Sequence, residues 1–325
     1  DYLLSGRIDS YRTAKQFIHA DGHLVWGDLS LSCLRTPEGD VERLIGQVTD
    51  ITNEVEAQQK LTQRDEQNRI LTKRLQAKTD RLTAELQSAA AYVATILPGD
   101  LDGTVAVSSR YVPSRALAGD CFDYRWIDGD HLIAYLLDVS GHGIQPALLS
   151  VSVHNLLRSG SIPGSVLMQP DRVLAELNEL FSMEKHAGNY FTIWYGVYEA
   201  STQTLTYCSG GHPPALLMPA TADAAAIAQL STGGMPVGMF SDAEYGCATV
   251  HVTPGDALLL YSDGVYEIPT PAGQTWSLKE FTALCEQRAG TPGCTLDTLI
   301  DTLRRQTTDG AFDDDLTLVC LKFAD

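Results

Sequence analysis

Aspartates that directly follow or precede apolar runs are the residues of this chain best placed for chemistry. Asp138 lies in LLDVSGHG (136–143), where an apolar run ends and two glycines follow. Asp120 opens the turn GDCFDY, Asp263 follows the run LLLY (258–261), and three aspartates at 313–315 precede the run LTLVCL. Each pattern predicts a buried strand that delivers an aspartate to the edge of a sheet, next to a tight turn.

Four such carboxylates at one edge would repel one another, and only protons or cations relieve that repulsion. Oxygen-only ligands favour hard cations such as Mg²⁺, Mn²⁺ or Ca²⁺, and no group of Cys and His has the spacing of a zinc site. Two ions that share one carboxylate could acidify a water for attack on phosphorus. An Asp before Gly is by itself usually a turn residue, so the prediction rests on the four turns together.

Two residues near these turns have open roles. His142, between the glycines of SGHG, suits a general acid that protonates a leaving serine oxygen. A turn histidine that hydrogen-bonds the backbone is the interpretation we favour. Arg115 is a candidate contact for a substrate phosphate, with an ordinary salt bridge as the alternative. The helix expected from Pro146 would present its positive end to the same phosphate.

The first 50 residues favour antiparallel strands. Strands are expected at 11–19, 23–33 and 41–48, with Asp21-Gly22 as the turn between the first two. Three strands alone expose a large face and need partners, so this segment is expected to be the last part of a larger domain.

Residues 51–97 contain neither Gly nor Pro and predict one long helix, which Pro98-Gly99 ends. A heptad register places Leu61, Asn68, Leu75, Leu82, Ala89 and Ile96 on one seam. The seam is polar in its middle and apolar late, which favours a parallel coiled-coil homodimer. A single helix packed on its own domain is the alternative.

Strands outnumber helices after residue 100, and many adjoin one another. Strands are expected at 105–111, 132–137, 190–198, 205–208, 257–261 and 316–323, and helices at 146–158, 170–186, 278–287 and 296–306. This order indicates an α+β layered domain. The predicted organisation is therefore strands at 1–50, a helical linker at 51–97 and a large domain at 98–325.

Composition excludes several classes of function. The formal net charge of −18 opposes binding to nucleic acid, so a two-metal nuclease is the weaker alternative for the acidic edge. No stretch has the length and apolarity of a membrane span, and none has the pattern of a signal peptide. Seven irregularly spaced cysteines predict reduced thiols and a cytoplasmic location.

Two resemblances to known families follow from these motifs. The stretch GQVTDIT (46–52) and the strands before it resemble the C-terminal part of a PAS sensor domain. Residues 85–325 resemble the SpoIIE-type branch of the metal-dependent protein serine/threonine phosphatases, which have the protein phosphatase 2C fold. The stretches that carry this resemblance are AGDCFDY, LLDVSGHG, YFTIWYGVYE, CSGGHPPALL, GGMPVGMF, LLLYSDGVYE and DDDLTLVCL.

The phosphatase resemblance implies a β-sandwich flanked by helices, with two Mn²⁺ or Mg²⁺ ions at one edge. It implies the following ligands: Asp120, Asp138, the backbone carbonyl of Val139, Asp263 and Asp314, with Asp315 as the alternative to Asp314. Asp138 is the expected bridging carboxylate, and a metal-bound water is the expected nucleophile, so no side chain is required as the catalyst.

The same resemblance implies a bacterial signalling enzyme. Its expected substrate is a phosphorylated STAS-domain antagonist of an anti-sigma factor, dephosphorylated on Ser or Thr. The PAS-like strands and the coiled-coil linker would regulate it. A non-catalytic, metal-binding dimeric scaffold is the alternative function.

Overall fold

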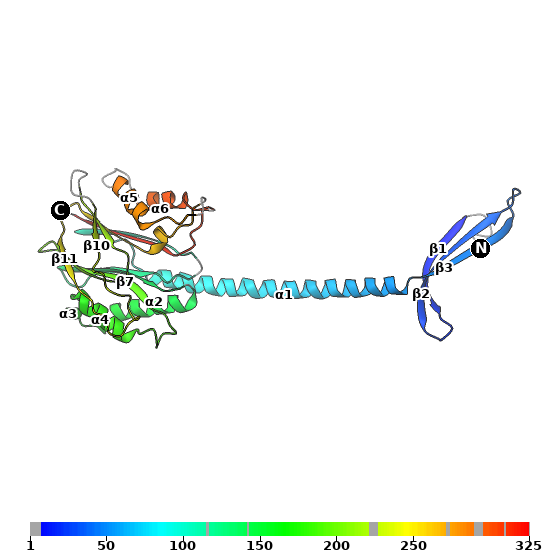
Figure 1. Ribbon diagram of the computed structural model, residues 1–325, viewed down its shortest axis with the longest axis horizontal. Helices are drawn as coiled ribbons and strands as arrows, with labels where there is room; N and C mark the ends of the chain where they lie inside the picture. Colours follow the sequence, from blue (N-terminus) through cyan, green and yellow to red (C-terminus); the bar gives the residue numbers. More distant parts are fainter. Residues whose placement is uncertain are drawn as a thin grey trace. The chain divides into compact units, whose positions relative to one another are not determined.

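Two units make up the chain, Asp1–Leu82 and Thr83–Asp325, and each is described by itself. The computed structural model describes residues 8–114, 117–141, 143–220, 227–270, 274–288, 295–308 and 310–324. The long helix α1 (Thr52–Ile96) begins in the first unit and ends in the second (Figure 1).

The first unit contains one antiparallel sheet of three strands in the order β1-β2-β3. Their bounds are β1 Ser10–Ile18, β2 Leu24–Arg35 and β3 Val41–Asp50, so the three expected strands are confirmed. Among the described residues of this sheet only Gly27 is buried. The sheet therefore buries very little side-chain surface within this chain.

Helix α1 begins at a side-chain cap, because Asp50 Oδ1 accepts hydrogen bonds from the backbone N–H (2.9 Å) and hydroxyl (2.6 Å) of Thr52. None of its residues is fully buried, and the seam residues Leu61, Leu75 and Leu82 are 54%, 65% and 60% exposed. Half-buried residues occur in its first turn, at Thr52 and Val55, and again near its end, at Leu86, Ala90, Val93 and Ile96. The helix thus packs on other parts of the chain only at its two ends.

Two five-stranded antiparallel sheets form the centre of the second unit, which confirms the expected β-sandwich. One sheet has the order β10 (Ala228–Leu230), β9 (Ala215–Met218), β12 (Ala257–Tyr261), β13 (Leu316–Phe323) and β4 (Val105–Val112). The other has the order β11 (Ala248–His251), β8 (Thr204–Gly210), β7 (Phe191–Glu199), β6 (His131–Val139) and β5 (Cys121–Trp126).

Helices cover the outer face of each sheet (Figure 1). Helices α2 (Ile144–Arg158), α3 (Gly164–Leu167) and α4 (Pro170–Leu180) pack on the sheet that contains β6. Helices α5 (Leu278–Arg288) and α6 (Leu296–Arg304) pack on the sheet that contains β12. A short 3₁₀ turn, η1 (Asp263–Val265), follows β12.

The expected helix at 170–186 is wrong at its C-terminal end, because α4 stops at Leu180. Phe181 is buried and packs edge-on against Phe191, and the backbone N–H of Met183 donates to Gly238 O at 2.8 Å. Tertiary contacts therefore replace the helical hydrogen bonds that the local sequence favours.

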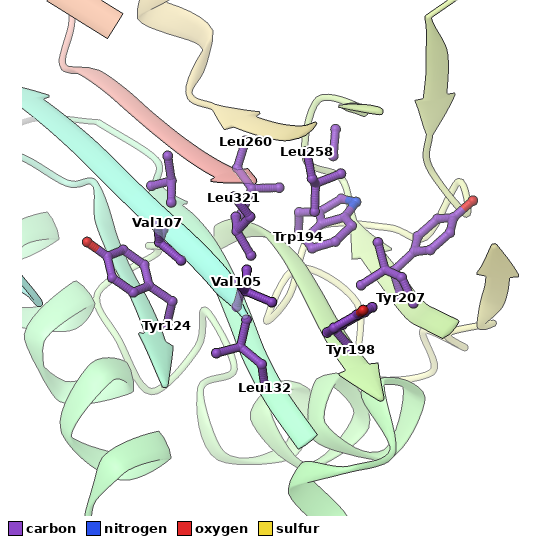
Figure 2. Packing of buried hydrophobic residues seen from close by; sticks show 14 of the residues in the cluster. Val105, Val107, Tyr124, Leu132, Trp194, Tyr198, Tyr207, Leu258, Leu260 and Leu321 are labelled. Atoms are coloured by element: carbon purple, nitrogen blue, oxygen red, sulfur yellow. The ribbon is translucent and has the colours of Figure 1, made fainter. Parts of the chain in front are cut away.

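Strand β6 is covered on both faces, which explains its continuous apolar run. Leu132, Ala134 and Leu136 point into the core between the sheets, whereas Ile133, Tyr135 and Leu137 pack under the helices. Figure 2 shows the inter-sheet core, in which Trp194 stacks on Tyr207 with ring centroids 5.7 Å apart.

None of the helices in the described parts of the chain has the length and apolarity needed to cross a membrane.

We predict that Trp194→Ala destabilises the second unit by about 3–5 kcal/mol. Trp194 is fully buried, and its Nε1–H donates to Leu230 O at 3.0 Å, so the change leaves both a cavity and an unpaired carbonyl. Urea unfolding followed by far-UV circular dichroism measures the loss. The control is Leu148→Ala on α2, where the side chain is 62% exposed, and a comparable loss there would contradict the prediction.

Candidate metal centre

Strand pairing places Asp120 and Asp138 side by side at one edge of the sandwich. Asp120 directly precedes β5, and Asp138 is the penultimate residue of β6. The two strands run antiparallel with Cys121 opposite Leu137. The start of β5 and the end of β6 therefore meet, and each delivers an aspartate there.

The other sheet delivers two more aspartates in the same way. Asp263 opens η1 directly after β12, and Asp314 lies two residues before β13. Tyr261 at the end of β12 pairs with Leu318 near the start of β13, and Ser262 N donates to Thr317 O at 3.2 Å.

Hydrogen bonds join the two sheets at this edge. The hydroxyl of Thr317 on β13 donates to Asp120 Oδ2 at 2.5 Å. The backbone N–H of Gly119 donates to Asp315 Oδ2 at 2.9 Å. The acidic ends of both sheets therefore lie at one place, which we call the acidic edge and define as Asp120, Asp138, Asp263 and Asp314.

Asp315 differs from Asp314 in what its carboxylate contacts. Asp315 is 5% exposed, and besides the Gly119 N–H it accepts from the backbone N–H (2.8 Å) and hydroxyl (2.9 Å) of Ser114. Asp314 is exposed, and its Oδ1 accepts from Asp315 N at 2.8 Å. Asp315 thus fixes the segment before Asp120 to the start of β13.

The carboxyl groups of the acidic edge raise one another's pKa. Burial raises the pKa of Asp138 well above its usual range, and the charges of Asp120, Asp263 and Asp314 raise it further. Burial is also the main cause for Asp120, with the charge of Asp315 added. Burial and the charge of Asp314 raise the pKa of Asp263 to about 6. These shifts indicate carboxylates whose charges oppose one another.

The donor atoms at this edge fit a hard divalent cation. Asp120 Oδ1 is buried and accepts no hydrogen bond from the described residues. A Cβ at Gly119 would lie 2.8 Å from Val139 O and 3.6 Å from Asp138 Oδ1, so only glycine leaves both oxygens accessible from this side. Carboxylate and carbonyl oxygens are the ligands that Mg²⁺ and Mn²⁺ prefer.

The donors are spread along the edge rather than gathered at one point. In the described parts of the chain, the triads of potential ligands within 4.8 Å of one another are His19/Asp21/His23 and Asp130/His131/Glu199. No three members of the acidic edge meet that limit as they stand.

His142 and Arg115, the two other residues that the sequence singled out, lie outside the described residues. The helix after the SGHG turn begins at Ile144 rather than Pro146, and no side chain caps its N-terminus at Gly143. Its first backbone N–H groups are therefore not satisfied by a side-chain cap.

The sequence motifs did not point to the hydroxyl groups that hold this edge together. Ser262 Oγ donates to Asp315 O at 3.0 Å and accepts from Thr317 N at 2.9 Å. Asp315 and Thr317 are two residues apart at the start of β13, so they share one face. The alternation of polar and apolar residues in Asp315-Leu316-Thr317 was the signal available in the sequence, because it places the two polar side chains on the same face of a strand.

Comparisons with known proteins agree with this architecture. The family model of stage II sporulation protein E (SpoIIE) matches residues 128–324. The phosphoserine phosphatase RsbP of Bacillus subtilis is 35% identical over 167 residues, which cover 50% of this chain and 40% of RsbP. The chain thus spans less than half the length of that relative.

Solved structures share the fold. The RsbU and RsbW domains of Rv1364c from Mycobacterium tuberculosis match with a TM-score of 0.56 and 26% identity, covering 68% of this chain and 60% of that one. The SiaA-PP2C domain of Pseudomonas aeruginosa matches with a TM-score of 0.64 and 18% identity, covering 76% of this chain and 99% of that domain. The second unit has the PP2C fold, and the chain belongs to the SpoIIE family.

Proposed function

We propose that this chain is a metal-dependent protein phosphatase that hydrolyses phosphoserine or phosphothreonine. The observation that carries the proposal is the convergence of Asp120, Asp138, Asp263 and Asp314 from both sheets on one edge, where burial and neighbouring carboxylates raise the pKa of Asp120, Asp138 and Asp263. Membership of the SpoIIE family and the likeness to RsbP, a phosphoserine phosphatase, support the same activity.

In this proposal the acidic edge and the Val139 carbonyl hold two Mn²⁺ or Mg²⁺ ions, with Asp138 between them. When bound, the ions would acidify a water for attack on phosphorus and neutralise charge on the phosphate. Asp314 rather than Asp315 is the ligand, because both carboxylate oxygens of Asp315 already accept hydrogen bonds from Ser114 and Gly119. Asp315 is a positioning residue for the segment that carries Asp120.

The proposed substrate is a phosphorylated STAS-domain antagonist of an anti-sigma factor, and the proposed location is the cytoplasm. The motif resemblance and the likeness to RsbP support this substrate class. Cys33, Cys121, Cys208 and Cys247 are thiols rather than disulfides, in keeping with a reducing compartment.

The proposed organisation is a PAS-like part at 1–50, a helical linker at 51–97 and a phosphatase domain at 98–325. We propose a parallel homodimer through α1, because the seam residues Leu61, Leu75 and Leu82 stay exposed among the residues that the structure describes. An isolated helix of this length needs such burial to be stable in water.

A path from the linker to the acidic edge supports regulation through α1. The last residue of α1, Ile96, accepts a hydrogen bond through its carbonyl from Arg158 Nη1 on α2 at 3.3 Å. Arg158 Nε lies 3.5 Å from Asp123 Oδ2 on β5, and Asp123 is fully buried three residues after Asp120. A rotation of α1 would therefore displace groups that contact the strand next to the metal ligands.

We predict that Asp138→Asn lowers Mn²⁺-dependent hydrolysis of p-nitrophenyl phosphate and of a phosphoserine peptide by about 100-fold or more. Loss of a mere partner of a metal ligand already costs about 10–100-fold, and Asp138 is the proposed bridging ligand itself.

The matched control is Asp242→Asn, an exposed aspartate outside the acidic edge, which should keep full activity. Absence of phosphatase activity from the unmodified protein with either metal would favour the non-catalytic scaffold instead.

We predict that Mn²⁺ raises the melting temperature more at about pH 7.5 than at about pH 5. The pKa of Asp263 is raised from 3.8 to about 6, so between these values the metal-free folded protein binds more protons than the unfolded chain. Its stability therefore falls as the pH rises through this window, and Mn²⁺ replaces the lost protons. Differential scanning fluorimetry measures the shift, which should vanish in Asp138→Asn. An equal shift at both pH values would contradict this prediction.

We predict that Leu75→Asn with Leu82→Asn converts the proposed dimer into a monomer, measured by light scattering after gel filtration. Both side chains lie on the seam, and polar groups there weaken coiled-coil pairing. Leu71→Asn is the matched control, because Leu71 is 65% exposed but off the seam. A monomeric starting protein would refute the dimer.

A further inference from the structure

The hairpin between β1 and β2 brings two histidines and an aspartate together, outside the sequence motifs of the phosphatase family. The chain turns at Ala20-Asp21-Gly22, between His19 and His23. His19 N donates to His23 O at 2.8 Å, Gly22 N donates to His19 O at 2.9 Å, and Gly22 has a φ of 89°. The turn therefore has a defined geometry that favours glycine at its last position.

The three side chains converge above this turn. Asp21 Oδ1 lies 3.1 Å from His19 Nδ1, and Asp21 Oδ2 lies 3.8 Å from His23 Nδ1. All three potential ligand atoms lie within 4.8 Å of one another. Ligands at about 2.1 Å in a tetrahedral site are about 3.4 Å apart, so small side-chain rotations suffice to bind one ion.

The two imidazole rings lie close enough to serve one ion. They stack with centroids 4.4 Å apart and an interplanar angle of 27°. His19 Nδ1 accepts a long hydrogen bond from Asp21 N at 3.4 Å, which a bound ion would replace. The charge of Asp50 also acts on both histidines, which adds attraction for a cation.

We propose that His19, Asp21 and His23 form a binding site for a late first-row divalent metal ion, Zn²⁺ or Cu²⁺. Imidazole with one carboxylate suits these ions rather than Mg²⁺, and three protein ligands leave a position open for water or another donor. The site is open to solvent, since the side chains of His19, His23 and Asp21 are 48%, 57% and 71% exposed. It differs in ligand chemistry from the oxygen-only acidic edge.

The second triad, Asp130/His131/Glu199, provides an internal comparison. Both oxygens of Asp130 accept hydrogen bonds from Ser201, at 2.7 and 2.6 Å, and His131 Nδ1 lies 3.0 Å from Asp128 Oδ2. Its potential ligand atoms are therefore engaged within the chain, and it contains only one imidazole. We expect it to bind Zn²⁺ and Cu²⁺ much more weakly.

The experiment titrates the full chain with Zn²⁺ against a chromogenic chelator, and with Cu²⁺ followed by electron paramagnetic resonance. Excess Mg²⁺ is present throughout, because it competes for the carboxylate edge but poorly for imidazole. We expect one site whose Cu²⁺ spectrum shows nitrogen ligands. Its affinity should fall about 10-fold or more in His19→Ala and in His23→Ala.

Two controls make the outcome decisive. His131→Ala and Asp40→Asn, the latter in the next turn of the same sheet, should leave the affinity unchanged. The substituted side chains at the β1–β2 hairpin are exposed, so circular dichroism should show unchanged folding. Equal affinity in the double variant His19→Ala/His23→Ala, or loss of binding in His131→Ala, would overturn the proposal. Neither readout depends on phosphatase activity.

Discussion

Repulsion among buried carboxylates is the constraint on which the rest of the second unit depends. Burial and the charges of neighbouring carboxylates raise the pKa of Asp120, Asp138 and Asp263. The fold therefore holds these carboxyl groups closer together than their mutual repulsion favours. A rigid frame must resist that separation. The hydrogen bonds from Thr317 to Asp120 and from Gly119 to Asp315 join the two sheets at this point.

Two glycines let the backbone come close enough for this arrangement. A Cβ at Gly264 would clash with the carbonyl oxygen of Asp315, so no other residue fits there without a shift of the backbone. At Gly119 it would press on Val139 O. The glycines beside the acidic turns therefore serve close packing of main chain on main chain, which is a stricter requirement than a flexible turn.

The strands of the second unit that the sequence predicts most plainly are those that the fold buries on both faces. Strands β6, β12 and β13 lie between a core and a helix layer, so their apolar runs were plain. Strand β5 was missed because its sequence, CFDYRW, includes two charged residues. Asp123 on this strand is fully buried and is paired with Arg125 at 2.5 Å, a compensation that only the three-dimensional structure reveals.

The same reasoning separates the parts of the site. Asp138, Asp263 and Asp314 were predictable, because the apolar runs of β6, β12 and β13 beside them are plain in the sequence. Asp120 was predicted from its turn motif, although the strand that follows it was not recognised. The different surroundings of Asp314 and Asp315 were not, since they depend on Ser114 and Gly119, about 200 residues away in the chain. The contact from Ile96 through Arg158 to Asp123 is equally non-local. The carboxylate of Asp123 is buried, and its Oδ1 accepts no hydrogen bond from the described residues. If regulation passes through this contact, Arg158 has to move relative to that carboxylate. Positions of Arg158 that leave Asp123 without its partner would be costly, which favours two discrete arrangements over a gradual shift.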